Sequence, residues 1–100
     1  MPQDSDMFDI EKREDGTIAL IGRCHAGFTE DVRDTLQGIT GSCVIDFGAL
    51  DYIASAGLGV LLAAQKRLKA GGGGLVLENL NPHIREVFRI AGFDKIFEIR

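Results

Sequence analysis

The stretch "DYIASAGLGVLL" (residues 51–62) marks a change from an apolar strand to a helix. It follows "CVIDF" (Cys43–Phe47), a short apolar run with one acid, which is typical of a strand at the centre of a sheet. A helix is predicted from about Ala56 to Ala70, then a glycine turn, Gly71–Gly74, and a strand, Leu75–Asn79. The helix is expected to bury a stripe of leucines: Leu58, Leu61, Leu62 and Leu68. This order predicts parallel strands joined by a right-handed crossover.

The residues before this unit predict a hairpin and a first helix. Met7–Lys12 alternates apolar and polar side chains, as a half-buried strand does. Asp15-Gly16 is a turn signal, and Thr17–Ile21 follows it as a second, antiparallel strand. Thr29, followed by two acids, predicts a helix start with a hydroxyl cap. The expected apolar face of that helix comprises Val32, Leu36 and Ile39.

The residues after it predict a third helix and a short final element. Asn81 is placed as the helix cap, Pro82 as the first helical residue and Gly92 as the residue that ends the helix. Its expected inner face comprises Ile84, Val87, Phe88 and Ala91, and the final packed residues are Phe93, Ile96, Phe97 and Ile99. The complete order predicts one α/β domain over residues 1–100. Its mixed sheet would have four to five strands, with the helices packed mainly on one face.

Composition excludes several classes of protein. The 100 residues carry a net charge of −4, which argues against a general nucleic-acid binder. The N-terminus lacks the pattern of a signal peptide, and the longest apolar run is too short to span a bilayer, so we expect a cytoplasmic protein without membrane insertion. Cys24 and Cys43 lack metal or redox spacing and are expected to be reduced, partly buried thiols.

No catalytic, metal or cofactor site can be assembled from the sequence. His25 and His83 have no ligand spacing to each other or to the cysteines, and no nucleophile, base and acid form a set. Gly71–Gly74 lies between a helix and the following strand, which is the wrong order for a phosphate loop. We therefore expect a binding protein without a cofactor rather than an enzyme.

Ser55 stands at the start of the second predicted helix, where backbone N–H groups lack partners within the helix. One interpretation is an N-cap, worth about 1 kcal/mol relative to alanine. The other is a phosphorylation site, because the positive helix end would tolerate a phosphoryl group there. Spacing alone favours the cap.

The sequence resembles a known family over nearly its whole length. Residues 46–99, "DFGALDYIASAGLGVLLAAQKRLKAGGGGLVLENLNPHIREVFRIAGFDKIFEI", are similar to the STAS domain of single-domain bacterial anti-sigma factor antagonists. The resemblance implies a STAS fold and a role in partner switching. It implies as partners an anti-sigma factor that is a serine kinase of the histidine-kinase-like ATPase fold, and a PP2C-type phosphatase that reverses the phosphorylation.

The residues that match the family's motifs define the expected site. The usual motif, Asp-Ser-Ser/Thr-Gly-Leu, aligns on Gly57-Leu58, so Ala54 replaces the acid and Ala56 replaces the usual phosphoacceptor. Ser55 is the hydroxyl that remains, one residue earlier, and His25 occupies the place of an acid in the loop after the second strand. The phosphorylation site is expected at Ser55. The partner-binding residues are expected to be His25, Ala54, Ser55, Ala56, Gly57 and Gly59.

Two other functions stay open at this point. The chain could be a STAS interaction subunit that is never phosphorylated, either a decoy antagonist or a regulatory subunit of a lipid-transport ABC system. It could also be a small-molecule or nucleotide-binding module that uses the cleft at the loop end of the fold.

Overall fold

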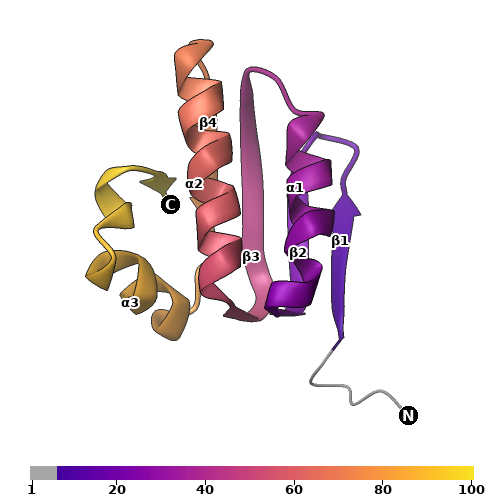
Figure 1. Ribbon diagram of the computed structural model, residues 1–100, viewed down its shortest axis with the longest axis vertical. Coiled ribbons are helices and arrows are strands. Elements are labelled where there is room, and N and C mark those ends of the chain that lie inside the picture. Colours follow the sequence, from indigo (N-terminus) through magenta and orange to yellow (C-terminus); the bar gives the residue numbers. More distant parts are fainter. Residues whose placement is uncertain (1–6) are drawn as a thin grey trace.

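The computed structural model describes residues 7–100; residues 1–6, part of the segment in which the sequence predicts no signal peptide, lie outside this range. Its elements form a five-stranded sheet in the order β1-β2-β3-β4-β5, antiparallel between β1 and β2 and parallel elsewhere (Figure 1). The predicted α/β class and mixed sheet are confirmed. The elements are β1 (Phe8–Lys12), β2 (Ile18–Cys24), η2 (Ala26–Phe28), α1 (Thr29–Gln37), β3 (Ser42–Ile53), α2 (Ser55–Ala70), β4 (Gly74–Glu78), α3 (Pro82–Ile90), η3 (Phe93–Lys95) and β5 (Glu98–Ile99).

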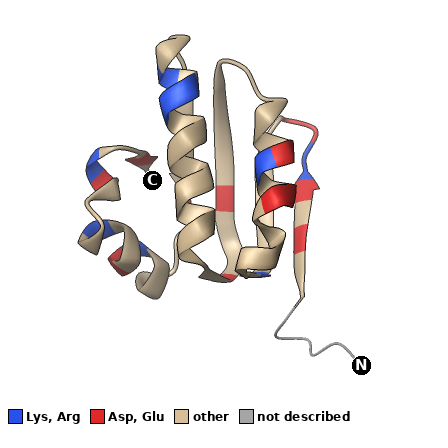
Figure 2. Cartoon of the chain, viewed as in Figure 1, with Lys and Arg blue, Asp and Glu red and all other residues tan. Residues whose placement is uncertain are grey.

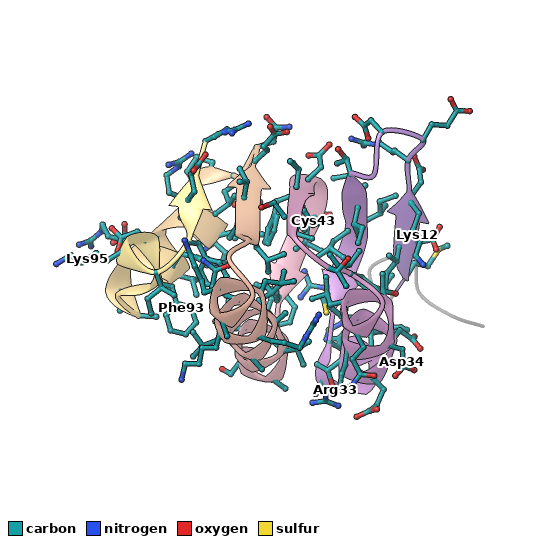
Figure 3. The ribbon with its side chains drawn as sticks, turned by 90° about the horizontal axis from the view of Figure 1, so that it is seen from above. Lys12, Arg33, Asp34, Cys43, Phe93 and Lys95 are labelled. Carbon is teal, nitrogen blue, oxygen red and sulfur yellow. The ribbon has the colours of Figure 1, made fainter. Side chains whose placement is uncertain are left out.

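Two helices cover one face of the sheet. Seen from above, α1 and α2 lie on the same side, while many charged side chains project from the opposite side (Figure 3). The core between helices and sheet is mainly aliphatic. Its fully buried large side chains are Ile18, Leu20, Ile45, Phe47, Leu50, Leu61, Leu75, Leu77, Ile84 and Phe88.

The central strand is longer than the sequence predicts. β3 runs for 12 residues, beyond the predicted end at Phe47, and β2 also continues to Cys24. The pairing of β2 with β3 shifts register between Ala19 and Ile21 and again between Gly22 and Arg23. These irregularities break the alternation of apolar side chains, which is why the pattern alone ends the strand too early.

The buried face of α2 is rotated from the predicted leucine stripe. Leu61 and Leu68 are buried as expected, but Leu58 and Leu62 are only half-buried. The buried residues are Gly57, Val60, Leu61, Ala64, Gln65 and Leu68. Gly57 belongs to the buried face and packs closely on β3, because a Cβ atom there would lie 2.8 Å from Cγ1 of Ile53. The helix therefore approaches β3 along its glycine.

The starts of α1 and α3 differ from each other in their capping. The Thr29 hydroxyl donates to the Ala26 carbonyl oxygen at 2.8 Å, and the cap position is Phe28, so the predicted threonine cap is wrong. The preceding turn, η2, takes up this hydroxyl. Asn81 does cap α3, accepting from the Ile84 N–H at 2.8 Å, as predicted.

The predicted apolar faces of α1 and α3 are confirmed in their central residues. Val32 and Leu36 are buried; Ile39 packs against the core but lies beyond the end of α1 at Gln37, so its predicted place on the helix is wrong. On α3, Ile84 and Phe88 are buried and Val87 is half-buried, but Ala91 is exposed, contrary to the prediction. Gly92 follows with a φ of +77°, the left-handed conformation expected of the glycine that ends a helix.

Candidate partner-binding site

Ser55 is the first residue of α2 and its side chain is exposed. Ala54 occupies the cap position, with extended backbone and no side-chain cap bond, so the interpretation of Ser55 as the N-cap is wrong. The Ala54 carbonyl oxygen accepts from the N–H groups of Gly57 at 2.9 Å and Leu58 at 3.2 Å. The N–H groups of Ser55 and Ala56 precede these bonds and have no acceptor within the helix. The Ser55 hydroxyl thus lies at the positive end of α2 but does not cap the helix.

The start of α2 is held firmly against the ends of two strands. The Ala54 N–H donates to the Cys24 carbonyl oxygen at 2.8 Å, which ties the end of β2 to the turn before α2. Gly57 is buried, and a Cβ atom there would also come within 3.5 Å of the Cys24 sulfur. Among the predicted site residues, Gly57 therefore positions the helix, while Ala56 and Gly59 are exposed and Ala54 is half-buried.

A cation and two rings lie at the same end of the sheet. Tyr52, near the end of β3, pairs in register with Arg23 of β2, and the Arg23 guanidinium lies 4.7 Å from the Tyr52 ring centroid. The His25 ring lies 5.3 Å from the same ring. The sequence alone predicts His25 as a candidate partner-binding residue but does not reveal the Arg23–Tyr52 pair. Only the register of the parallel strands brings Arg23 and Tyr52 together. Tyr and Arg are enriched at binding hot spots, so the pair adds to the candidate surface.

The two thiols and the glycine turn have structural roles. Cys24 is fully buried, and burial raises the pKa of its thiol to about 11; burial also raises the pKa of the Cys43 thiol. Both stay protonated at neutral pH and are poor nucleophiles. In Gly71–Gly74, the Gly73 N–H donates to the Leu68 carbonyl oxygen and the Gly74 N–H donates to the Gly41 carbonyl oxygen. These bonds hold the turn between α2 and β4 against the residue before β3.

Within residues 7–100, no group of three or more His, Cys, Asp or Glu side chains is arranged to hold a metal ion. Over the same residues, no helix has both the length and the hydropathy that crossing a bilayer requires.

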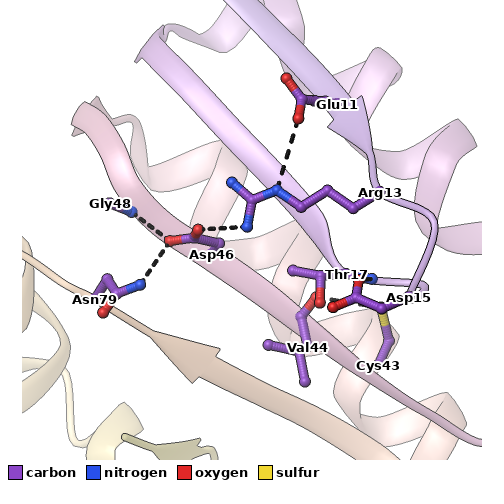
Figure 4. Close-up of polar contacts among 9 residues, drawn as sticks. All are labelled: Glu11, Arg13, Asp15, Thr17, Cys43, Val44, Asp46, Gly48 and Asn79. Atoms are coloured by element: carbon purple, nitrogen blue, oxygen red, sulfur yellow. Dashed lines mark hydrogen bonds and ion pairs between the residues drawn. The ribbon is translucent and has the colours of Figure 1, made fainter.

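A second polar cluster joins the turn between β1 and β2 to β3 and to the residue after β4 (Figure 4). Asp46 of β3 accepts from the Arg13 guanidinium at 2.7 Å, the Gly48 N–H at 2.8 Å and the Asn79 side-chain amide at 3.0 Å. Its side chain is only 14% exposed. These bonds, that from Asn79 foremost, hold the pKa of the Asp46 carboxyl below its usual range. The cluster ties the hairpin turn to β3 and to the end of β4, which is a structural role.

Replacing Asp46 with alanine is expected to lower the free energy of unfolding by about 1–3 kcal/mol at pH 7, because three donors lose a charged acceptor. The folded-state pKa lies below the unfolded value of about 3.9, so this stabilisation is complete above that value. It is lost as the pH falls through the folded-state pKa. Urea unfolding at pH 7 and at about pH 2.5 should show the gap between wild type and variant closing in acid.

The matched control is Glu11→Ala, which removes an exposed carboxylate 3.6 Å from the same arginine. Its loss should stay within about 0.5 kcal/mol. An Asp46→Ala gap of equal size at both pH values would contradict the assignment of the stabilisation to the ionised carboxylate.

Comparison with known proteins finds one family by sequence and the same fold among solved structures. Residues 8–99 match the protein family model described as "Mlab, STAS domain". BtrV of Bordetella bronchiseptica, described as a candidate anti-sigma factor antagonist, is 55% identical over 56 residues, which are 56% of this chain and 48% of that protein. The match thus spans about half the length of this curated relative.

Solved structures give the same fold at low sequence identity. An anti-sigma factor antagonist from Mycobacterium paratuberculosis has a TM-score of 0.77 at 19% identity, covering 93% of this chain and 83% of that one. The Bacillus cell fate determinant SpoIIAA in its phosphorylated form has a TM-score of 0.68 at 24% identity, covering 94% and 91%. At such identities the likeness establishes the fold alone.

Proposed function

The chain belongs to the STAS domain family, and from this premise we propose that it is an anti-sigma factor antagonist in a partner-switching system. In this proposal it is a cytoplasmic binding protein without catalysis of its own. Unphosphorylated, it binds an anti-sigma factor that is also a serine kinase of the histidine-kinase-like ATPase fold. Phosphorylation at Ser55 breaks the complex, and a PP2C-type phosphatase restores it. The relative described as a candidate anti-sigma factor antagonist supports this function.

The observation that carries the proposal is the exposed hydroxyl of Ser55 at the first position of α2. A phosphoryl group there would bring a charge of about −1.5 to −2 to the positive end of the helix, where it is tolerated. The residues around the hydroxyl have small side chains: Ala54, Ala56 and Gly59. A kinase active site can therefore approach the hydroxyl closely. The added charge would change the docking surface and leave the buried packing beneath Gly57 intact.

The test is phosphorylation by the kinase that co-purifies with the chain from its native host. With ATP, the wild-type chain should gain one phosphoryl group, and Ser55→Ala should gain none, by intact-protein mass spectrometry. Ser42→Ala is the matched control, since Ser42 is also exposed but lies at the other end of β3. Phosphorylation that persists in Ser55→Ala would refute the assignment of the site.

A second candidate function is a regulatory subunit of a lipid-transport ABC system that is never phosphorylated. Two observations favour it: the matching family model is described as Mlab, and alanines occupy positions 54 and 56, where the family motif has an acid and a hydroxyl. Co-purification separates the two functions. Recovery of transporter components, with no phosphorylated chain in the cell, would support the second and exclude the first.

A further inference from the structure

The outward face of α2 is unusual for a surface helix. From Ser55 to Gln65 the helix has no charged side chain, although several of these positions are exposed. Figure 2 shows the contrast, since only the C-terminal end of α2 is blue while α1 carries both charges. A helix that faces water normally has charged or polar residues there. The small exposed residues on this face are Ser55, Ala56, Gly59 and Ala63.

A groove runs between this face and α1. Its volume is about 210 Å³, and its walls include Gly59 and Ala63 from α2 and Arg33 and Gln37 from α1. A Cβ atom built on Gly59 would have no neighbour within 4 Å, so this wall of the groove is open. Because the exposed residues of this wall include Gly59 and Ala63, the backbone of another element can approach closely at these positions.

Two cations line the groove in a chain whose net charge is −4. The Arg67 guanidinium donates to the carbonyl oxygens of Leu36 at 2.7 Å and Ile39 at 3.1 Å. These acceptors are neutral, so they orient the guanidinium without cancelling its charge. Arg33 pairs with Glu30 one turn earlier, at the surface, where such a pair is weak and exchangeable. The groove therefore combines small uncharged residues of α2, Gly59 and Ala63, with Arg67 further along α2 and Arg33 on α1.

We propose that this groove receives a helix of the anti-sigma factor whose carboxylates face Arg33 and Arg67. The inference rests on the proposed function and specifies the partner's chemistry at this surface. A helix fits because Gly59 and Ala63 allow close axial packing, and acidic side chains complement the two arginines. Gly59 lies one turn from Ser55 on the same exposed face. A phosphoryl group on Ser55 would therefore repel this acidic helix, which accounts for release on phosphorylation.

The test measures the affinity of the co-purified anti-sigma factor for purified variants by calorimetry. Gly59→Leu places a side chain at the wall of the groove, and its Cβ atom would meet no neighbour within 4 Å. It should weaken binding by roughly 30-fold or more, as loss of a well-packed interface contact does. Ala70→Leu adds the same side chain at the exposed C-terminal end of α2, outside the groove, and should leave the affinity unchanged. Arg33→Glu should weaken binding about tenfold and reduce its dependence on salt.

Each result bears on one claim. If wild type binds and Gly59→Leu binds equally well, the groove is refuted while the proposed function stands. If Gly59→Leu weakens binding and Arg33→Glu does not, the acidic partner helix is refuted. If the wild-type chain fails to bind the anti-sigma factor, the proposed function is refuted together with this assignment of the groove. Circular dichroism melts of every variant establish that the chain is folded in each comparison.

Discussion

Replacing Gln65 with alanine is expected to lower the free energy of unfolding by about 3–5 kcal/mol. Gln65 is 2% exposed. The nitrogen and the oxygen of its side-chain amide each form a hydrogen bond with a backbone group from another part of the chain. Its Nε2 donates to the Ile96 carbonyl oxygen at 2.8 Å, and its Oε1 accepts from the Leu75 N–H at 2.6 Å. Alanine would leave both backbone groups unsatisfied and would also open a cavity between α2, β4 and the C-terminal segment.

Urea unfolding at neutral pH measures this loss, and Lys66→Ala is the matched control. Lys66 is the next residue on α2, is exposed, and should change stability by no more than about 0.5 kcal/mol when truncated. A loss below about 1 kcal/mol in Gln65→Ala would mean that the amide does not link the three elements. The expected loss is a large share of the total stability of a domain of this size, which is about 5–15 kcal/mol.

Replacing Gly22 with alanine is expected to cost about 3 kcal/mol or more. Gly22 has a φ of +93°, and a Cβ atom there would overlap the Met7 carbonyl oxygen. That oxygen accepts from the Arg23 N–H at 2.9 Å, so the overlap falls on the contact that begins the pairing of β1 with β2. The alanine would have to displace β1 or adopt a different backbone conformation.

Gly16→Ala separates the two causes of this loss. Gly16 has nearly the same φ, +89°, but a Cβ atom there has no neighbour within 4 Å. It should show only the conformational cost, about 1–2 kcal/mol. Thermal and urea unfolding of both variants give the comparison. Equal losses at the two positions would show that the overlap with β1 contributes nothing.

The sequence predicts most of the secondary structure because local signals agree with the tertiary fold. Asn81 and Gly92 bound α3 as their side-chain chemistry and backbone freedom require. Prediction fails where a contact between two neighbouring elements determines how a helix starts or which of its residues are buried. Gly57 of α2 packs directly on Ile53 of β3, and Thr29 bonds to Ala26 because η2 precedes α1.

In the candidate site, too, the sequence predicts what depends on local signals and misses what depends on contacts between elements. The sequence pattern correctly predicts that Ser55 lies at the start of α2. The interpretation of Ser55 as the N-cap is wrong, because the helix begins one residue earlier and Ala54 occupies the cap position. Arg23 and Tyr52 meet only through the pairing of β2 with β3, and the groove beside Gly59 exists only when α1 lies next to α2. A residue's neighbours across elements cannot be read from periodicity within one element.

The strand order of the sheet is also the order of the strands along the chain. Each strand after the first pairs with the one synthesised immediately before it, and no late strand has to insert between two earlier ones. A chain emerging from the ribosome can therefore extend its sheet one strand at a time, with each loop closed over a short stretch of sequence. β1 forms one edge of the sheet throughout. Until β5 is added, the other edge is the most recently made strand, and the next segment to emerge pairs with it.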